Sequence, residues 1–241
     1  MKINIRDINI NYDQYGDGKE DVVLLHGWGQ NIEMMNPIGK KICKDKRITV
    51  IDLPGFGDSD EPREEIDVFD YADIVKELLD KLKIKKPSLI GHSFGGRISI
   101  IYASKYPVNK LVLLGAPCIR HDTKPSTKVK ILKGLKKVPG LNKLEGFAKN
   151  HIGSRDYKAA SPIMKQILVN TVNIDLTECA KKIEVPTLLI WGTLDTEAPI
   201  EEAKELETLL KDGALITYEG GSHYTYLEFL NPVCNVINSF I

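Results

Sequence analysis

The stretch Gly91-His92-Ser93-Phe94-Gly95-Gly96 constrains the fold of this chain more than any other. It follows an apolar run at residues 87–90, which predicts a buried strand, and it precedes a helical pattern over residues 97–106. A serine at such a strand–turn–helix junction is typical of a nucleophile elbow, in which glycines without a Cβ let strand and helix approach closely. The alternative interpretation is an ordinary glycine-rich turn that contains a serine by chance.

Apolar runs alternate with helical patterns along most of the chain. Residues 2–15 alternate apolar and polar side chains, which predicts an antiparallel hairpin. Strands that are apolar throughout are typical of a parallel sheet covered by helices on both faces. The predicted fold class is therefore α/β, with ligands bound at the carboxyl ends of the strands. Further strands are predicted at residues 22–25, 48–51, 110–114, 185–191 and 214–218, and helices at residues 31–44, 68–82, 200–210 and 224–240.

One segment, residues 118–177, breaks this alternation, because it carries short helical patterns and no strand pattern. A helix is predicted near residues 126–138, and Ser161-Pro162 is typical of an N-cap followed by the first helical residue. We interpret the segment as a helical lid, or cap, inserted into a core domain made of residues 1–117 and 178–241.

The lid is strongly basic. Between Arg120 and Lys165 it contains twelve Lys and Arg residues against three Asp and Glu residues. A solvated helix face would explain this excess. The functional alternative is a surface that guides an anionic substrate or one carried on an acidic partner protein.

The bulk composition excludes several classes of protein. The chain of 241 residues has 33 basic and 33 acidic residues, so nothing draws it to nucleic acid. Its four cysteines are widely spaced, which argues against a zinc site or a disulfide framework and favours reduced thiols in the cytoplasm. No apolar run reaches membrane-spanning length, and the first residues lack the apolar core of a signal peptide. We expect neither a metal nor a cofactor.

A serine nucleophile needs a base, and the base needs a carboxylate that orients it. Asp195 follows the predicted strand 185–191, and His223 follows the last predicted strand. The chain order Ser93, Asp195, His223 is the one expected for a nucleophile elbow in a parallel sheet. Glu197 is the rival to Asp195. The other histidines, at positions 26, 92, 121 and 151, lie at places that suit a base less well.

Acyl transfer also needs two backbone donors for the oxyanion. One is predicted to be the N–H of Phe94, directly after the serine, and the other the N–H of Trp28 in the turn His26-Gly27-Trp28-Gly29. The side chains of Trp28, Phe94 and Cys118 are candidates for contact with substrate, and core packing is the alternative for each.

Five motifs, in this order and spacing, resemble the α/β-hydrolase superfamily, and the resemblance covers nearly the whole chain. It implies an eight-stranded, mostly parallel sheet with a helical cap, and a triad of Ser93, Asp195 and His223. Within the superfamily, the first two motifs are similar to those of the bacterial esterases that demethylate pimeloyl-acyl-carrier-protein methyl ester. The motifs are His26-Gly27-Trp28-Gly29, residues 52–59, the Ser93 turn, residues 191–195 and Gly221-Ser222-His223.

The predicted function is hydrolysis of a carboxylic ester or thioester through an acyl-enzyme on Ser93. One alternative is hydrolysis of a carbon–carbon bond in a diketone-like acid, which the resemblance also allows. Another is a ligand receptor that keeps the triad but turns over little substrate. The acyl and alcohol groups of the substrate do not follow from the sequence.

Overall fold

The computed structural model describes residues 1–120 and 160–241. Its strands form one eight-stranded sheet in the order β1-β2-β4-β3-β5-β6-β7-β8. β2 is antiparallel to both of its neighbours, and all other neighbouring strands pair in parallel. The expected eight-stranded, mostly parallel sheet is confirmed. The strands β1 to β8 span Lys2–Ile5, Ile8–Tyr15, Glu20–Leu25, Lys46–Ile51, Ser88–His92, Leu111–Leu114, Thr187–Gly192 and Gly213–Tyr218.

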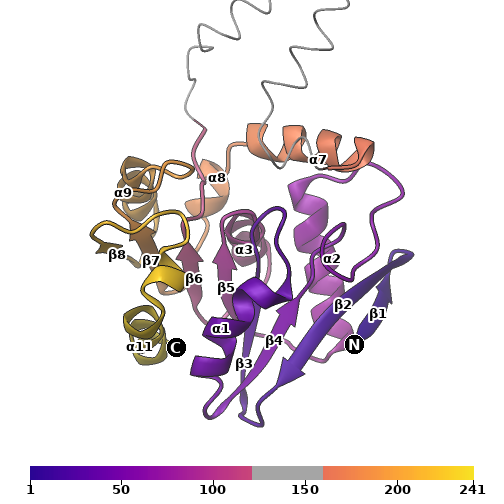
Figure 1. Ribbon diagram of the computed structural model, residues 1–241, viewed down its shortest axis with the longest axis horizontal. Helices are drawn as coiled ribbons and strands as arrows, with labels where there is room; N and C mark the ends of the chain where they lie inside the picture. The colour runs from indigo at the N-terminus through magenta and orange to yellow at the C-terminus, as the bar shows by residue number, and fades with distance from the viewer. Residues whose placement is uncertain (121–159) are drawn as a thin grey trace, which may run out of the picture.

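Helices cover both faces of this sheet (Figure 1). The helices α1 and α11 pack against each other on one face, while α2, α3, α8 and α9 line the other. Each face has its own hydrophobic core. The helix α7 runs across the upper right of the view, above α2 (Figure 1). The helices span Ile32–Ile42 (α1), Val68–Lys81 (α2), Phe94–Lys105 (α3), Pro162–Asn173 (α7), Thr177–Ala180 (α8), Ile200–Leu209 (α9), Thr225–Glu228 (α10) and Leu230–Phe240 (α11).

Local sequence signals explain several element boundaries. β1 and β2 form the expected hairpin, and its two turn residues, Arg6 and Asp7, have φ angles of 49° and 61°. The helix α2 begins with a capping box between Asp67 and Asp70. Ser161 caps α7 as expected, because its Oγ accepts the N–H of Met164. The helix expected at residues 126–138 lies outside the described residues.

The C-terminal helix differs from its prediction. A single helix over residues 224–240 is wrong, because the chain forms α10 and α11 with Phe229 between them at φ −114° and ψ 41°. Pro232 gives the physical reason. It has no N–H to donate, so it fits within the first turn of a helix and disfavours a helix that runs through it.

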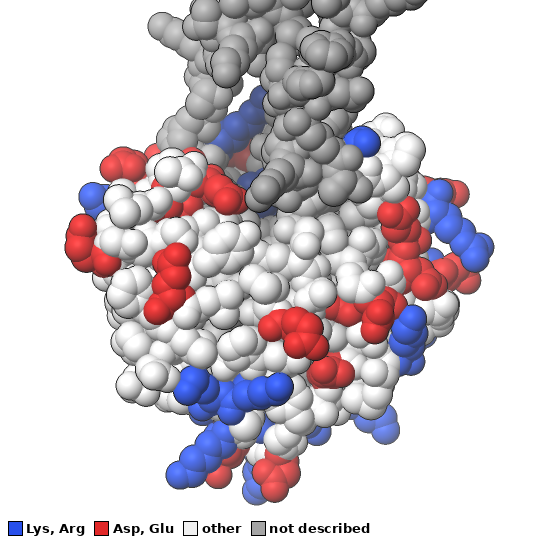
Figure 2. Space-filling model, in the orientation of Figure 1, with Lys and Arg blue, Asp and Glu red and all other residues white. Residues whose placement is uncertain are grey.

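The described residues carry an excess of negative charge. The whole chain is balanced, but residues 121–159 contain ten basic and three acidic residues, which leaves the described part with seven more acidic than basic side chains. In Figure 2, uncharged areas separate small groups of acidic and basic side chains on the visible face. Among the helices described, none is long and apolar enough to cross a membrane.

Candidate active site

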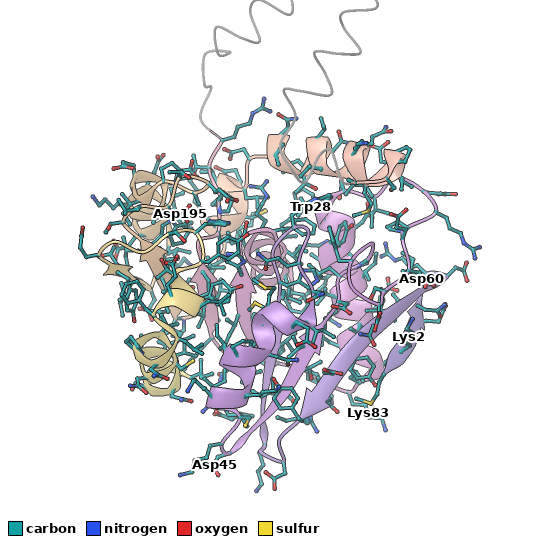
Figure 3. All side chains as sticks on the ribbon, in the orientation of Figure 1. Lys2, Trp28, Asp45, Asp60, Lys83 and Asp195 are labelled. Carbon is teal, nitrogen blue, oxygen red and sulfur yellow. The ribbon has the colours of Figure 1, made fainter. Side chains whose placement is uncertain are left out.

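The predicted site residues lie on loops at one end of the sheet. Trp28 follows β3, Ser93 follows β5, Asp195 follows β7 and His223 follows β8. Since these four strands run parallel, their carboxyl ends share one edge of the sheet. Figure 3 shows Trp28 and Asp195 at that end, far from Asp45, which precedes β4.

Ser93 occupies the turn between β5 and α3 with φ 50° and ψ −111°, a backbone conformation that non-glycine residues rarely adopt. Such a residue typically costs about 1–3 kcal/mol and persists only where its surroundings hold it. The Ser93 N–H donates to the carbonyl of Leu114 (3.0 Å) on β6. A Cβ on Gly95 would come within 2.3 Å of the Leu25 carbonyl oxygen, so the turn requires glycine there. The geometry is that of a strained elbow with a serine at its apex.

Asp195 and His223 form a direct, buried contact. Asp195 Oδ2 lies 2.8 Å from His223 Nδ1, and the two side chains are 1% and 5% exposed. The other oxygen, Oδ1, accepts the N–H groups of Glu197 and Ala198, both at 2.9 Å. Because a carboxylate only accepts, Nδ1 carries the imidazole proton and Nε2 keeps a lone pair. The arrangement can therefore accept a proton at Nε2.

The rival carboxylate, Glu197, does not take the place of Asp195. Its Oε2 lies 3.6 Å from His223 Nε2, the opposite ring nitrogen, and its side chain is 62% exposed. Of the two carboxylates, Asp195 is therefore the buried one and the one in contact with His223 Nδ1.

The loop that carries His223 is held by a clamp that sequence reasoning missed. Ser222 donates its backbone N–H and its hydroxyl to the two carboxylate oxygens of Glu228, at 2.8 Å and 2.6 Å. The spacing i to i+6 has no regular period, so the sequence offers no signal for it.

The turn containing Trp28 lies directly against the elbow. The Gly95 N–H donates to the carbonyl of His26 (3.0 Å) and so joins the two loops. Among the hydrogen bonds of the described residues, none uses the N–H of Trp28 or of Phe94. These are the two donors that the sequence predicts for an oxyanion.

His26 holds this turn from beneath as a neutral, fully buried ring. It donates from Nδ1 to the Gly27 carbonyl (2.7 Å) and accepts the Leu53 N–H at Nε2 (3.0 Å). Burial lowers the pKa of His26 from 6.5 to about 4. Asp52, at the end of β4, accepts the N–H groups of Ile32 (2.7 Å) and Asp58 (2.9 Å) and braces the neighbouring loop.

The three candidates for substrate contact differ in exposure. Trp28 lines a cavity of about 250 Å³. Phe94 is only 3% exposed and packs edge-on against Trp28 at 5.1 Å and Tyr71 at 5.0 Å, and Cys118 is 1% exposed in the same core. Burial raises the pKa of the Cys118 thiol to about 12, so it stays protonated. The other residues that line the cavity are Gly29, Gly55, Phe56, Glu61, Ala160, Ser161 and Met164.

A second cavity of about 470 Å³ lies near His223, since Glu197 is part of its wall. Arg97, one helical turn beyond Ser93, also lines it and is 6% exposed. Its guanidinium donates to the carbonyls of Pro117 (3.0 Å), Thr171 (2.9 Å) and Ile174 (2.5 Å). Arg97 thus fixes the C-terminal end of α7 against the core.

Comparison with known proteins assigns this geometry to a family. A family model described as alpha/beta hydrolase fold matches residues 22–145, and one described as TAP-like protein matches residues 168–241. The chain belongs to the α/β-hydrolase family. The resemblance that the five motifs carry is confirmed.

This α/β-hydrolase is similar to proteins with several different names. It is 26% identical to the pimeloyl-[acyl-carrier protein] methyl ester esterase of Aliivibrio fischeri, over 94% of this chain and 95% of the relative. It is 27% identical to a 2-hydroxy-6-oxononadienedioate/2-hydroxy-6-oxononatrienedioate hydrolase of Paraburkholderia phymatum, over 98% and 91%. The esterase EaEST of Exiguobacterium antarcticum has the same fold, with a TM-score of 0.78, 24% identity and coverage of 99% and 98%. Family and relatives identify the chain as a hydrolase.

Proposed function

We propose that the chain is a serine hydrolase that cleaves a carboxylic ester or thioester through an acyl-enzyme on Ser93. The Ser93 hydroxyl oxygen attacks the carbonyl carbon while its proton passes to His223 Nε2. The leaving alcohol or thiol takes that proton as its bond to the acyl carbon breaks. Water then attacks the acyl-enzyme, gives a proton to the same nitrogen and releases the acid, and the hydroxyl of Ser93 is restored.

The contact between Asp195 and His223 carries this proposal. Two backbone N–H groups hold Oδ1 of Asp195, and Oδ2 accepts the proton of His223 Nδ1. This bond fixes the tautomer that exposes a basic Nε2, which is the form that a serine nucleophile needs. The strained turn at Ser93 lies at the same edge of the sheet.

We assign the oxyanion site to the backbone N–H groups of Trp28 and Phe94. Both lie beside the hydrogen bond that joins the turn at His26 to the elbow at Gly95. Loss of one such donor typically removes about 2.7–4 kcal/mol of transition-state stabilisation. The side chain of Trp28 would line the acyl pocket, while Phe94 would contribute through its backbone.

The division into a core (residues 1–117 and 178–241) and a cap (residues 118–177) also belongs to this proposal. The start of α7 supports this division, because Met164 of the cap packs closely against Gly55 of the core. A Cβ on Gly55 would come within 2.5 Å of the Met164 sulfur. The proposed cap segment thus forms part of the cavity beside Trp28.

A fluorophosphonate probe tests the nucleophile. We expect labelling of the wild type at Ser93 and none of Ser93→Ala, with hydrolysis of short-chain p-nitrophenyl esters lost in parallel. Ser239→Ala, an exposed serine on α11, is the matched control and should label like the wild type. Absence of both labelling and turnover in the wild type would refute the hydrolase mechanism and favour a receptor.

Carbon–carbon bond hydrolysis is the second candidate. The relative from Paraburkholderia phymatum supports it, since its name describes a hydrolase of this kind of keto acid and it matches nearly the whole chain. A ring-fission dienone acid is the discriminating substrate. Turnover of this acid with no turnover of esters would replace the ester proposal.

The charge of the substrate can be tested separately. The basic composition of residues 120–165 favours an anionic substrate or one on an acidic carrier protein, whereas the described cavity walls contain Glu61 and Glu197. Paired esters that differ only in a terminal carboxylate resolve this conflict. A preference for the anionic ester that weakens with salt supports guidance by the basic segment, and a preference for the neutral ester contradicts it.

A further inference from the structure

His92 is a buried histidine next to the nucleophile that the proposed reaction does not use. It is the last residue of β5, directly before Ser93, and it is 0% exposed. A fully buried imidazole is costly unless its nitrogens have polar partners, so the partners of His92 show what it does.

One ring nitrogen of His92 holds the backbone of the proposed base. Nε2 lies 3.0 Å from the carbonyl oxygen of His223. A carbonyl only accepts, so Nε2 carries the proton and donates it. Burial and the neighbouring His223 lower the pKa of His92 to about 3, and the ring is therefore neutral with this single N–H.

The ring also supports the loop by packing. Its centroid lies 4.8 Å from that of the His223 ring and 4.6 Å from that of Tyr226, which is fully buried. His92 thus packs against the segment that carries the proposed base, and a smaller side chain would lose these contacts.

The other ring nitrogen faces the turn that holds the proposed oxyanion donor. Nδ1 lies 3.2 Å from Oε1 of Gln30, and the same oxygen accepts the Gly27 N–H at 3.0 Å. Oε1 is held as the acceptor of the Gly27 N–H, and the neutral ring has no proton at Nδ1, so this second contact is packing rather than a hydrogen bond. The amide of Gln30 lies between His92 and Gly27, the residue before Trp28.

Other groups of the loop have other hydrogen-bond partners, whereas the carbonyl of His223 is held by His92. The imidazole is oriented by Asp195, and the preceding residue, Ser222, is clamped by Glu228. Within the described residues, His92 makes the one hydrogen bond to the His223 carbonyl. Two consecutive residues thus serve the proposed site: His92 holds the backbone of the proposed base, and Ser93 is the proposed nucleophile.

We propose that His92 is a positioning residue that sets the separation of Ser93 Oγ and His223 Nε2 through its hydrogen bond to the His223 carbonyl. Proton transfer depends steeply on that separation, and a misplacement of about 1 Å commonly costs about 10²-fold in rate. The inference rests on the proposed function, because it needs Ser93 as nucleophile and His223 as base.

Two substitutions that differ in reach test the hydrogen bond. In His92→Gln the amide nitrogen can reach the place of Nε2 and donate to the same carbonyl, whereas in His92→Asn it reaches only the place of Nδ1. We expect kcat for a p-nitrophenyl ester to fall about 10- to 100-fold in His92→Asn with KM within about twofold of wild type. His92→Gln should recover kcat to within about fivefold of wild type.

Equal losses of kcat in the two variants, or a change confined to KM, would overturn the inference. Thermal unfolding of both variants checks that they fold. If His92→Asn does not fold, His92→Met, which has similar length and no donor, takes its place in the comparison. Fluorophosphonate labelling keeps the two proposals apart. An unlabelled, inactive wild type would refute the serine mechanism itself, whereas a labelled wild type with a fully active His92→Asn would refute only the role of His92.

Discussion

The buried ring of His26 makes a specific contribution to the pH dependence of stability. In the folded chain its pKa is lowered to about 4 by burial, against an ordinary value of 6.5 in an unfolded chain. The unfolded state therefore binds this proton more readily. The stabilisation is fully present above about pH 6.5, and it is lost as the pH falls from there toward 4.

The size of this loss follows from the two pKa values. One pKa unit corresponds to about 1.4 kcal/mol, so the free energy of unfolding should fall by about 2 kcal/mol between pH 7.5 and pH 5 through this one group. Most small proteins are stable by only about 5–15 kcal/mol, so the change is easily measured. Protonation at Nε2 would also break the bond from the Leu53 N–H, which fixes the turn carrying Trp28.

His26→Gln is the matched variant. The glutamine oxygen can take the place of Nε2 as acceptor of the Leu53 N–H, and it does not titrate. Urea unfolding at pH 7.5, 6 and 5 gives the free energy of unfolding of each protein. From pH 7.5 to pH 5, the free energy of unfolding of the wild type should fall by about 2 kcal/mol more than that of His26→Gln. If the free energy of unfolding falls equally in both proteins as the pH is lowered, a neutral His26 with a lowered pKa is refuted.

Three further outcomes test the site. Asp195→Asn should leave stability nearly unchanged but lower kcat by about 10⁴-fold, because an amide facing His223 Nδ1 favours the wrong tautomer; a loss below about tenfold in ester hydrolysis would contradict the triad. Gly95→Ala should destabilise the fold by about 1–3 kcal/mol in urea unfolding, because its Cβ would meet the Leu25 carbonyl at 2.3 Å. Trp28→Ala should enlarge the 250 Å³ cavity and shift kcat/KM toward longer acyl chains across a series of p-nitrophenyl esters, and an unchanged profile would place the acyl chain elsewhere.

Much of the fold could be predicted because the strands are apolar throughout. Residues 22–25 and 48–51 are buried on both faces of the sheet, and a run of that kind leaves few alternatives to a central strand. The elbow was predictable from its glycines. At position 95 only glycine, which has no Cβ, tolerates contact with the Leu25 backbone. In both cases the residue types within a short stretch carry the signal.

The parts that could not be predicted depend on contacts between distant loops. The bond from Leu53 to His26 joins residues 27 positions apart, and no spacing rule points to it. Adjacency to the nucleophile fixes where the Phe94 backbone lies, but the direction of its ring follows from packing against Trp28 and Tyr71. The break at Phe229 did have a signal in Pro232, which the continuous apolar periodicity of the segment obscured.

Two buried histidines perform the same task at the two ends of the proposed site. His26 joins the turn carrying Trp28 to the loop after β4, and His92 joins the elbow to the carbonyl of His223. Both pKa values are lowered, so both rings are neutral near pH 7, and the single N–H of each ring donates to a backbone carbonyl. Acid that protonates these rings would therefore weaken both connections. His26→Gln keeps an acceptor for the Leu53 N–H without a titrating ring, so this variant should keep that connection near pH 4, where the wild type begins to lose it.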